Sequence, residues 1–217
     1  KPGLRLAGWS DFDPTRRQVL AGAGLTIAAG AVLQADWRTS HPYPFLIQPP
    51  GARDNDFLSK CVRCGLCVRA CPTGVLQPSL TEAGLAGIWT PVLVAENGYC
   101  DYACNICGQV CPVGAIPPLS LEEKRQQVLG KAYIDQHRCI AWTGDGECIV
   151  CEEMCPLPEK AITLEIRTVE TAAGSFEQRL PVVDRQKCIG CGICEFKCPV
   201  VGTAAIRVYT PGLGVES

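Results

Sequence analysis

Cysteine is the residue type with which this chain can do chemistry, because its sixteen cysteines follow a repeated pattern. They form four motifs of four, and the last cysteine of every motif is followed directly by proline. Three closely spaced cysteines with a Cys-Pro are the ligand pattern of 4Fe-4S clusters. We therefore predict four 4Fe-4S clusters whose iron ligands are motif 1, Cys61, Cys64, Cys67 and Cys71; motif 2, Cys100, Cys104, Cys107 and Cys111; motif 3, Cys139, Cys148, Cys151 and Cys155; and motif 4, Cys188, Cys191, Cys194 and Cys198.

The spacing within a motif suits a cubic cluster for a physical reason. Three thiolates on one tight loop can reach three corners of the cube, whereas the cysteine before the proline is carried away on a short helical turn. In proteins that hold two such clusters, this fourth cysteine ligates the neighbouring cluster. Four motifs therefore predict two pairs of clusters.

Other uses of clustered cysteines fit this spacing less well. Zinc sites normally use two well-separated C-x2-C hooks, and cysteines two residues apart rarely meet disulfide geometry. No C-x2-C is followed by histidine, so there is no attachment sequence for covalent haem. Motif 2 keeps one alternative open, because its C-x3-C-x2-C spacing is that of radical S-adenosylmethionine enzymes, although Cys111 offers a fourth ligand.

Composition adds further constraints. The chain has 217 residues and a formal net charge of -2, which gives no indication of nucleic-acid binding. Small cysteine-rich modules bury little hydrocarbon, so we expect bound metal to supply much of the folding free energy. Six cations lie within or beside the motifs, and they either offset the negative charge of the clusters or are ordinary solvated side chains: Arg63, Arg69, Arg138, Arg185, Lys187 and Lys197.

The N-terminal region has the pattern of an export segment. Residues 1–18 are expected to be a cytoplasmic segment that contains a twin-arginine signal, Arg16 and Arg17. The uncharged run 19–35 follows, and we predict that it is a retained transmembrane signal-anchor helix. The run is short for a membrane and rich in alanine and glycine, so a soluble helix is the alternative. Residues 36–55 are predicted to be a Pro-rich extended linker.

The cluster region is expected to contain short elements between the motifs. A helix is predicted over 119–130 from its amphipathic pattern and the glycine at its end. A second short helix is predicted over 80–89, and strands are predicted over 90–96, 131–135 and 204–210, with a hairpin formed by 161–167 and 179–184.

Nothing else in the sequence offers catalytic chemistry. There is no Gly-rich dinucleotide fingerprint, no phosphate loop and no paired acid/base site. Glu152 and Glu153 are expected to be solvated or to tune charge, and His41 and His137 are expected to be surface residues. We therefore expect a chain without a catalytic site of its own.

Residues 15–210 resemble the MauM/NapG group of ferredoxin-type proteins, which are found with methylamine and periplasmic nitrate respiration. The resemblance is carried by the twin-arginine segment, by PPGARDNDFLSKCVRCGLCVRACP and by CIVCEEMCPLPEKAI. Motif 2 departs from the C-x2-C-x4-C spacing expected in many relatives. The resemblance implies an α+β fold with two bacterial-ferredoxin-like, βαβ-type two-cluster modules and an N-terminal membrane-anchoring helix.

The resemblance also favours one pairing of the motifs. Related four-cluster subunits of the dimethyl sulfoxide reductase type nest motifs 2 and 3 inside motifs 1 and 4. We therefore expect an outer module of residues 56–95 and 180–217 and an inner module of residues 96–179. The strands predicted around motifs 3 and 4 suit consecutive pairing equally, so that alternative stays open.

What the resemblance implies about function is an electron relay. The chain would carry electrons between a membrane quinol-oxidising or other integral membrane subunit and an extracytoplasmic cytochrome or reductase. Its cluster domain would lie on the periplasmic side of the cytoplasmic membrane, anchored by residues 19–35, and it would bind no nucleic acid. The alternatives are an iron-sulfur subunit of a molybdenum-enzyme or hydrogenase complex and a tethered scaffold whose clusters are structural.

Overall fold

The structure is a computed structural model that describes residues 15–39, 46–52, 56–171 and 174–210. The chain separates into two units, Lys1–His41 and Pro42–Ser217, and each unit is described by itself. Of the segments predicted at the N-terminus, residues 1–14, 40–45 and 53–55 lie outside the described residues.

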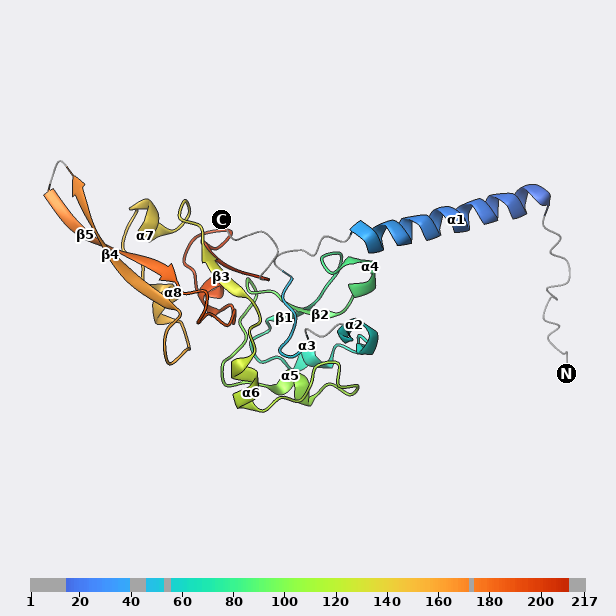
Figure 1. The fold of residues 1–217 in the computed structure, drawn as a ribbon, viewed down its shortest axis with the longest axis horizontal. Helices are drawn as coiled ribbons and strands as arrows, with labels where there is room; N and C mark the ends of the chain where they lie inside the picture. Colours follow the sequence, from blue (N-terminus) through green and yellow to red (C-terminus); the bar gives the residue numbers. More distant parts are fainter. Residues whose placement is uncertain (1–14, 40–45, 53–55, 172–173, 211–217) are drawn as a thin grey trace, which may run out of the picture. The chain divides into compact units, whose positions relative to one another are not determined.

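The first unit contains α1 (Arg16–Thr39), which begins at the two arginines and confirms a helix over 19–35 (Figure 1). The Thr15 N–H donates to Oε1 of Gln18 over 3.0 Å at the start of this helix. The six alanines and three glycines of 19–35 contribute little to membrane insertion. None of the described helices is both long enough and apolar enough to span a membrane. The predicted membrane-anchoring role of 19–35 is therefore not supported.

The first half of the second unit is built from short elements around motifs 1 and 2. Its strands pair antiparallel, with Leu76 opposite Leu93, and Ile47 of the preceding segment adds an isolated bridge to Leu93. The helix predicted over 119–130 is shorter, but Ser120 and Glu123 form the capping box that starts it. The elements are α2 (Phe57–Lys60), α3 (Leu66–Ala70), β1 (Leu76–Pro78), α4 (Gly84–Gly87), β2 (Pro91–Leu93), α5 (Ile106–Gln109) and α6 (Leu121–Gln126).

The second half holds motifs 3 and 4 between two antiparallel strand pairs. The predicted hairpin is confirmed and is longer than expected, with Ile162 opposite Val183 at its base (Figure 1). The predicted closing strand pairs with the strand before motif 3, with Ile134 opposite Ile206. The elements are β3 (Lys131–Ile134), α7 (Ile140–Thr143), α8 (Val150–Glu153), β4 (Ile162–Thr171), β5 (Gly174–Val183), α9 (Ile193–Phe196) and β6 (Ile206–Tyr209).

These contacts group neighbouring motifs. Helix α3 of motif 1 packs against α5 of motif 2, and α8 of motif 3 packs against α9 of motif 4. Strand β3 precedes motif 3 and strand β6 follows motif 4, and these two strands pair with each other. This packing differs from the nested modules expected over 56–95 with 180–217 and over 96–179, and it supports the consecutive alternative. The physical reason is that these helices pack directly on each other, although β1, α4 and β2 separate α3 from α5 and the β4–β5 hairpin separates α8 from α9 along the chain.

The core of the second unit is shared between hydrocarbon side chains and cysteines. Tyr209, Val208 and Ile116 are almost fully buried. Val208 and Ile116 belong to a hydrophobic cluster that also includes buried Cys67 and Cys194. A core of this composition places sulfur atoms where a larger protein would place aliphatic side chains, so its packing depends on what the sulfurs bind.

Candidate functional site

The sixteen cysteines line four cavities, with four cysteines in each. In every cavity three cysteines begin one motif, and the fourth is the Cys-Pro cysteine of another. Each group is named after the motif that contributes three: set 1 is Cys61, Cys64, Cys67 and Cys111; set 2 is Cys100, Cys104, Cys107 and Cys71; set 3 is Cys139, Cys148, Cys151 and Cys198; set 4 is Cys188, Cys191, Cys194 and Cys155.

The local backbone explains how a motif divides its cysteines. In motif 1, Gly65 has a φ of 71° and precedes α3, which turns the chain between Cys64 and Cys67. Cys71 follows α3 in an extended conformation, with a φ of -69° and a ψ of 113°. Pro72 favours that conformation, because a residue before proline avoids the helical region. Cys71 thereby leaves the loop of its own motif and joins set 2.

The four-cysteine cavities match a cubic cluster in the number and chemistry of their donors. A 4Fe-4S cluster takes one thiolate at each of its four irons. Within the described part of the chain, no three His, Cys, Asp or Glu side chains are placed to hold a lone metal ion; each set surrounds a cavity instead. Of the two histidines, His137 is exposed and His41 lies outside the described residues. The residues present therefore fit 4Fe-4S clusters.

Burial makes several of these thiols poor acids. It is the main cause that raises the pKa of Cys67 to about 11. It also raises the pKa of Cys107, Cys151 and Cys191 to about 12. Because the thiolate is the metal ligand, these groups would be protonated at neutral pH without a cation. Iron binding must therefore displace protons and supplies the positive charge that keeps the buried thiolates ionised.

Hydrogen bonds reach several sulfurs. The Ala132 N–H donates to Sγ of Cys188 over 3.4 Å, and the Ile116 N–H donates to Sγ of Cys111 over 3.5 Å. Burial raises the pKa of Cys71, but hydrogen bonds, led by the Thr73 hydroxyl, outweigh it and leave that pKa lowered. Hydrogen bonds to cluster sulfurs are one of the means by which proteins set reduction potentials.

A buried lysine that sequence reasoning missed lies beside set 2. Lys124 of α6 is 3% exposed, and its Nζ donates to the carbonyl oxygen of Asp101. Burial raises the pKa of Cys100, and the positive charge of Lys124 opposes that rise. A lysine in an amphipathic stretch has the pattern of a solvated side chain, so no sequence signal indicated this position.

Contacts between the sets place them in a row. Burial and then neighbouring thiols raise the pKa of Cys107, and one of those thiols is Cys67 of set 1. Sets 2 and 4 are joined where the Cys100 N–H donates to the Cys191 carbonyl oxygen over 2.7 Å. Cys151 of set 3 is among the thiols that, after burial, raise the pKa of Cys194 in set 4. The order along the row is therefore set 1, set 2, set 4 and set 3.

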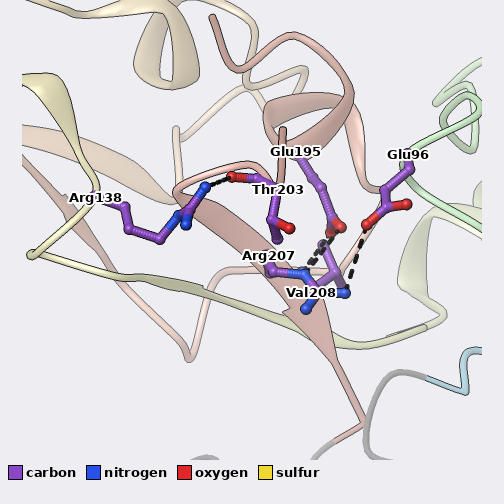
Figure 2. Close-up of polar contacts among 6 residues, drawn as sticks. All are labelled: Glu96, Arg138, Glu195, Thr203, Arg207 and Val208. Carbon is purple, nitrogen blue, oxygen red and sulfur yellow. Dashed lines mark hydrogen bonds and ion pairs between the residues drawn. The ribbon is translucent and has the colours of Figure 1, made fainter. Parts of the chain in front are cut away.

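A buried carboxylate joins the two halves at the middle of this row (Figure 2). Glu195, 6% exposed, accepts a hydrogen bond from the Val208 N–H over 2.7 Å. Its Oε1 lies 3.5 Å from Nε of Arg207, whose Nη2 lies 3.8 Å from Oε1 of Glu96. Burial raises the pKa of Glu195, while Val208 and Arg207 oppose the rise. Arg207 of β6 thus bridges a carboxylate beside Cys194 and one from the loop that follows β2.

Replacing this arginine is expected to destabilise the holoprotein. In Arg207→Met, Glu195 stays buried without its cation, which costs about 3 kcal/mol and lowers the thermal midpoint by about 10 °C. Glu195→Gln combined with Arg207→Met should recover most of the loss. Folding raises the pKa of Glu195, so lowering the pH protonates and neutralises this carboxylate in the folded protein. The difference in thermal midpoint between Arg207→Met and the natural protein should therefore become smaller at lower pH.

Arg138→Met is the matched control for a thermal melt followed by circular dichroism. Arg138 is exposed, and its Nη2 donates to the carbonyl oxygen of Thr203 over 2.7 Å (Figure 2). Its replacement is expected to cost less than about 1 kcal/mol. Equal midpoints for the two single variants would contradict the bridging role of Arg207.

Comparison with known proteins agrees with this geometry. Two family models described as "4Fe-4S binding domain" match residues 57–77 and 180–206, which contain motifs 1 and 4. The chain is 38% identical to the methylamine utilization ferredoxin-type protein MauM of Methylorubrum extorquens, over 94% of this chain and 92% of that protein.

Two further relatives cover most of the chain. The MauM protein of Paracoccus denitrificans is 37% identical over 93% of this chain and 90% of its own length. The ferredoxin-type protein NapG of Escherichia coli is 37% identical over 88% of this chain and 82% of its own length. Because these identities extend over most of both chains, this chain belongs to the MauM/NapG family of ferredoxin-type proteins.

Proposed function

We propose that this chain is an electron-transfer subunit that holds four 4Fe-4S clusters, one in each cysteine set. A bound 4Fe-4S cluster supplies reversible one-electron chemistry. The chain's own contribution is to hold four thiolates around each site, to exclude water from the buried sets and to place the sets side by side. No other group of described residues offers an acid, base or nucleophile built for catalysis.

The observation that carries the proposal is the row of sets. Set 1 and set 3 lie at its ends, and sets 2 and 4 meet through the Cys100–Cys191 backbone hydrogen bond. A row with two ends suits a relay that accepts electrons at one end and delivers them at the other. A protein that used clusters only for folding would have no need of contacts between neighbouring sets across two modules.

Partners and location extend the same proposal. The donor would be a quinol-oxidising or other integral membrane subunit, and the acceptor would be an extracytoplasmic cytochrome or reductase. The chain would act on the outer face of the cytoplasmic membrane. Support comes from the paired arginines at the start of α1, which have the pattern of an export signal for proteins that fold before transport.

Redox titration of the holoprotein, followed by electron paramagnetic resonance, tests the proposal. We expect about sixteen irons per chain and signals from four interacting centres that appear as the potential is lowered, because reduced neighbours couple magnetically. An iron content near this value, without any centre that is reduced within the range of reduction potentials of biological quinones, would favour a scaffold with structural clusters. Iron near half this value would show that only two sets are filled.

A further inference from the structure

The surroundings of set 1 differ from those of the other sets. Cys64 is the one exposed cysteine of the sixteen, all of which are described. The cavity of set 1 has a volume of about 250 Å³, whereas those of sets 2, 3 and 4 have about 30, 20 and 20 Å³. Because the same kind of cluster is proposed for all four sets, the larger cavity of set 1 contains space that its cluster does not need. We call this space, with the residues that line it, the set 1 groove.

The set 1 groove exposes apolar side chains. Val62 is 60% exposed, Trp89 is 59% exposed and Val113 is 44% exposed, and all three line the groove together with Cys64. Clustered exposed apolar side chains mark binding surfaces more often than scattered ones. They come from motif 1, from the segment before β2 and from the residues after motif 2, so the fold gathers them from three separate places.

The backbone of this groove is held in an unfavourable conformation. Of the described residues other than glycine, Arg63 (φ 56°) and Trp89 (φ 66°) have a positive φ, and both line the set 1 groove. Such a conformation costs on the order of 1 kcal/mol or more and persists where the surroundings impose it, often at functional sites. Because both strained residues line the same groove, we infer that the strained backbone serves to expose these two side chains there.

Buried hydrogen bonds hold the turn that carries Trp89. The backbone N–H of Trp89 donates to the Ser79 carbonyl oxygen over 2.8 Å. Ser79 is 1% exposed, and its hydroxyl donates to the Gly87 carbonyl oxygen over 2.6 Å. Thr90, also 1% exposed, donates to the same carbonyl oxygen. Trp89 is therefore presented on a rigid turn, which lowers the entropy that a partner must remove on binding.

Two arginines, Arg63 and Arg69, are the charged side chains that line the set 1 groove. The Arg63 Nη2 donates to the Ala86 carbonyl oxygen over 2.7 Å, and neither arginine takes part in an ion pair with another described residue. Tryptophan and arginine are the residues that most often dominate binding energy at interfaces. Opposite charge on the partner then gives orientation and speed of association.

We propose that the set 1 groove docks a one-electron redox protein that presents an apolar face rimmed by carboxylates. Trp89 and Val62 contact the apolar face, and Arg63 and Arg69 contact the carboxylates. The proposal rests on the electron-transfer function and makes set 1 the end of the row that this partner contacts. Docking there brings the partner against Cys64, the exposed sulfur.

The test uses the full-length holoprotein and a purified acidic flavodoxin as the probe. Isothermal titration calorimetry at low and high ionic strength measures binding, and stopped-flow oxidation of the reduced holoprotein measures transfer. We expect saturable binding that weakens as salt is added, since salt screens exposed charges. Trp89→Gly, which suits a positive φ, and the double variant Arg63→Glu with Arg69→Glu are each expected to weaken binding about tenfold.

Two controls separate docking from other effects. Arg63→Lys with Arg69→Lys keeps the charge and should bind nearly as well at low salt. Val201→Ala shortens an apolar side chain that is 94% exposed after motif 4 and should bind like the natural protein. Absence of saturable flavodoxin binding, or unchanged affinity of both Trp89→Gly and the charge-reversed variant, overturns the docking proposal. Failure of the proposed function is distinct, because it would appear as clusters that cannot be reduced in the redox titration.

Discussion

Removing iron from the holoprotein is expected to abolish the cooperative unfolding of the second unit. Apart from α1, the described helices have four to six residues, which is far below the length at which a helix is stable alone. Strands β1 and β2 have three residues each. Cysteines take part in the main hydrophobic cluster, so losing what they bind leaves cavities in the core.

The physical basis of this prediction is that metal binding and folding are one equilibrium in such modules. The long β4–β5 hairpin does not change the expectation, because an isolated two-stranded hairpin is marginally stable in water. Treatment with a chelator under reducing conditions, followed by a thermal melt in near-ultraviolet circular dichroism, makes the measurement. We expect the signal of packed aromatic side chains to disappear and the melt to lose its sigmoidal form.

Reconstitution provides the control for chemical damage. Ferrous iron and sulfide added to the chelated protein should restore both the signal and the cooperative melt. A cooperative transition that survives in protein shown by assay to be free of iron would contradict the prediction. It would mean that the hydrocarbon part of the core, around Tyr209, Val208 and Ile116, is sufficient by itself.

Cys64→Ala and Cys111→Ala are expected to damage the same iron site, although they belong to different motifs. Both residues line the cavity of set 1. Each single variant should lose about one quarter of the iron, or shift the magnetic signature of one centre. The double variant should lose no more than either single variant, because the site is already broken. Iron per chain and electron paramagnetic resonance of the purified variants give the measurement.

The pair Cys64→Ala and Cys198→Ala is the matched comparison. Cys198 lines the cavity of set 3 with three cysteines of motif 3. The losses of this pair should therefore add to about half of the iron, as independent sites do. Nested pairing makes the opposite prediction, because motifs 1 and 4 would then share their sites. Additive loss for Cys64 with Cys111 would contradict the consecutive arrangement.

The chemistry of the site was largely predictable from local sequence. Spacing alone grouped the cysteines into threes with a separate Cys-Pro, and the structure divides them in that way. The β4–β5 hairpin and a helix within 119–130 also followed from short-range patterns. These features depend on a few neighbouring residues, which is why a linear pattern indicates them.

Other features depended on contacts that no local pattern contains. The burial of Glu195 and Lys124 is invisible in sequence, since both have the pattern of solvated charges. The helix over 19–35 was predictable from its uncharged run, but none of the described helices is both long and apolar enough to span a membrane. The strained, exposed Trp89 depends on buried hydrogen bonds from a segment ten residues away.

By itself, the sequence grouped the cysteines into four candidate iron sites, because the covalent chain places three thiols together on one loop. Only the tertiary structure decided which motif supplies the fourth thiol, in what order the sets lie and which set reaches the surface. The physical reason is distance along the chain. The fourth cysteine leaves its loop at a proline, and its destination is set by the packing of α3 on α5 and of α8 on α9.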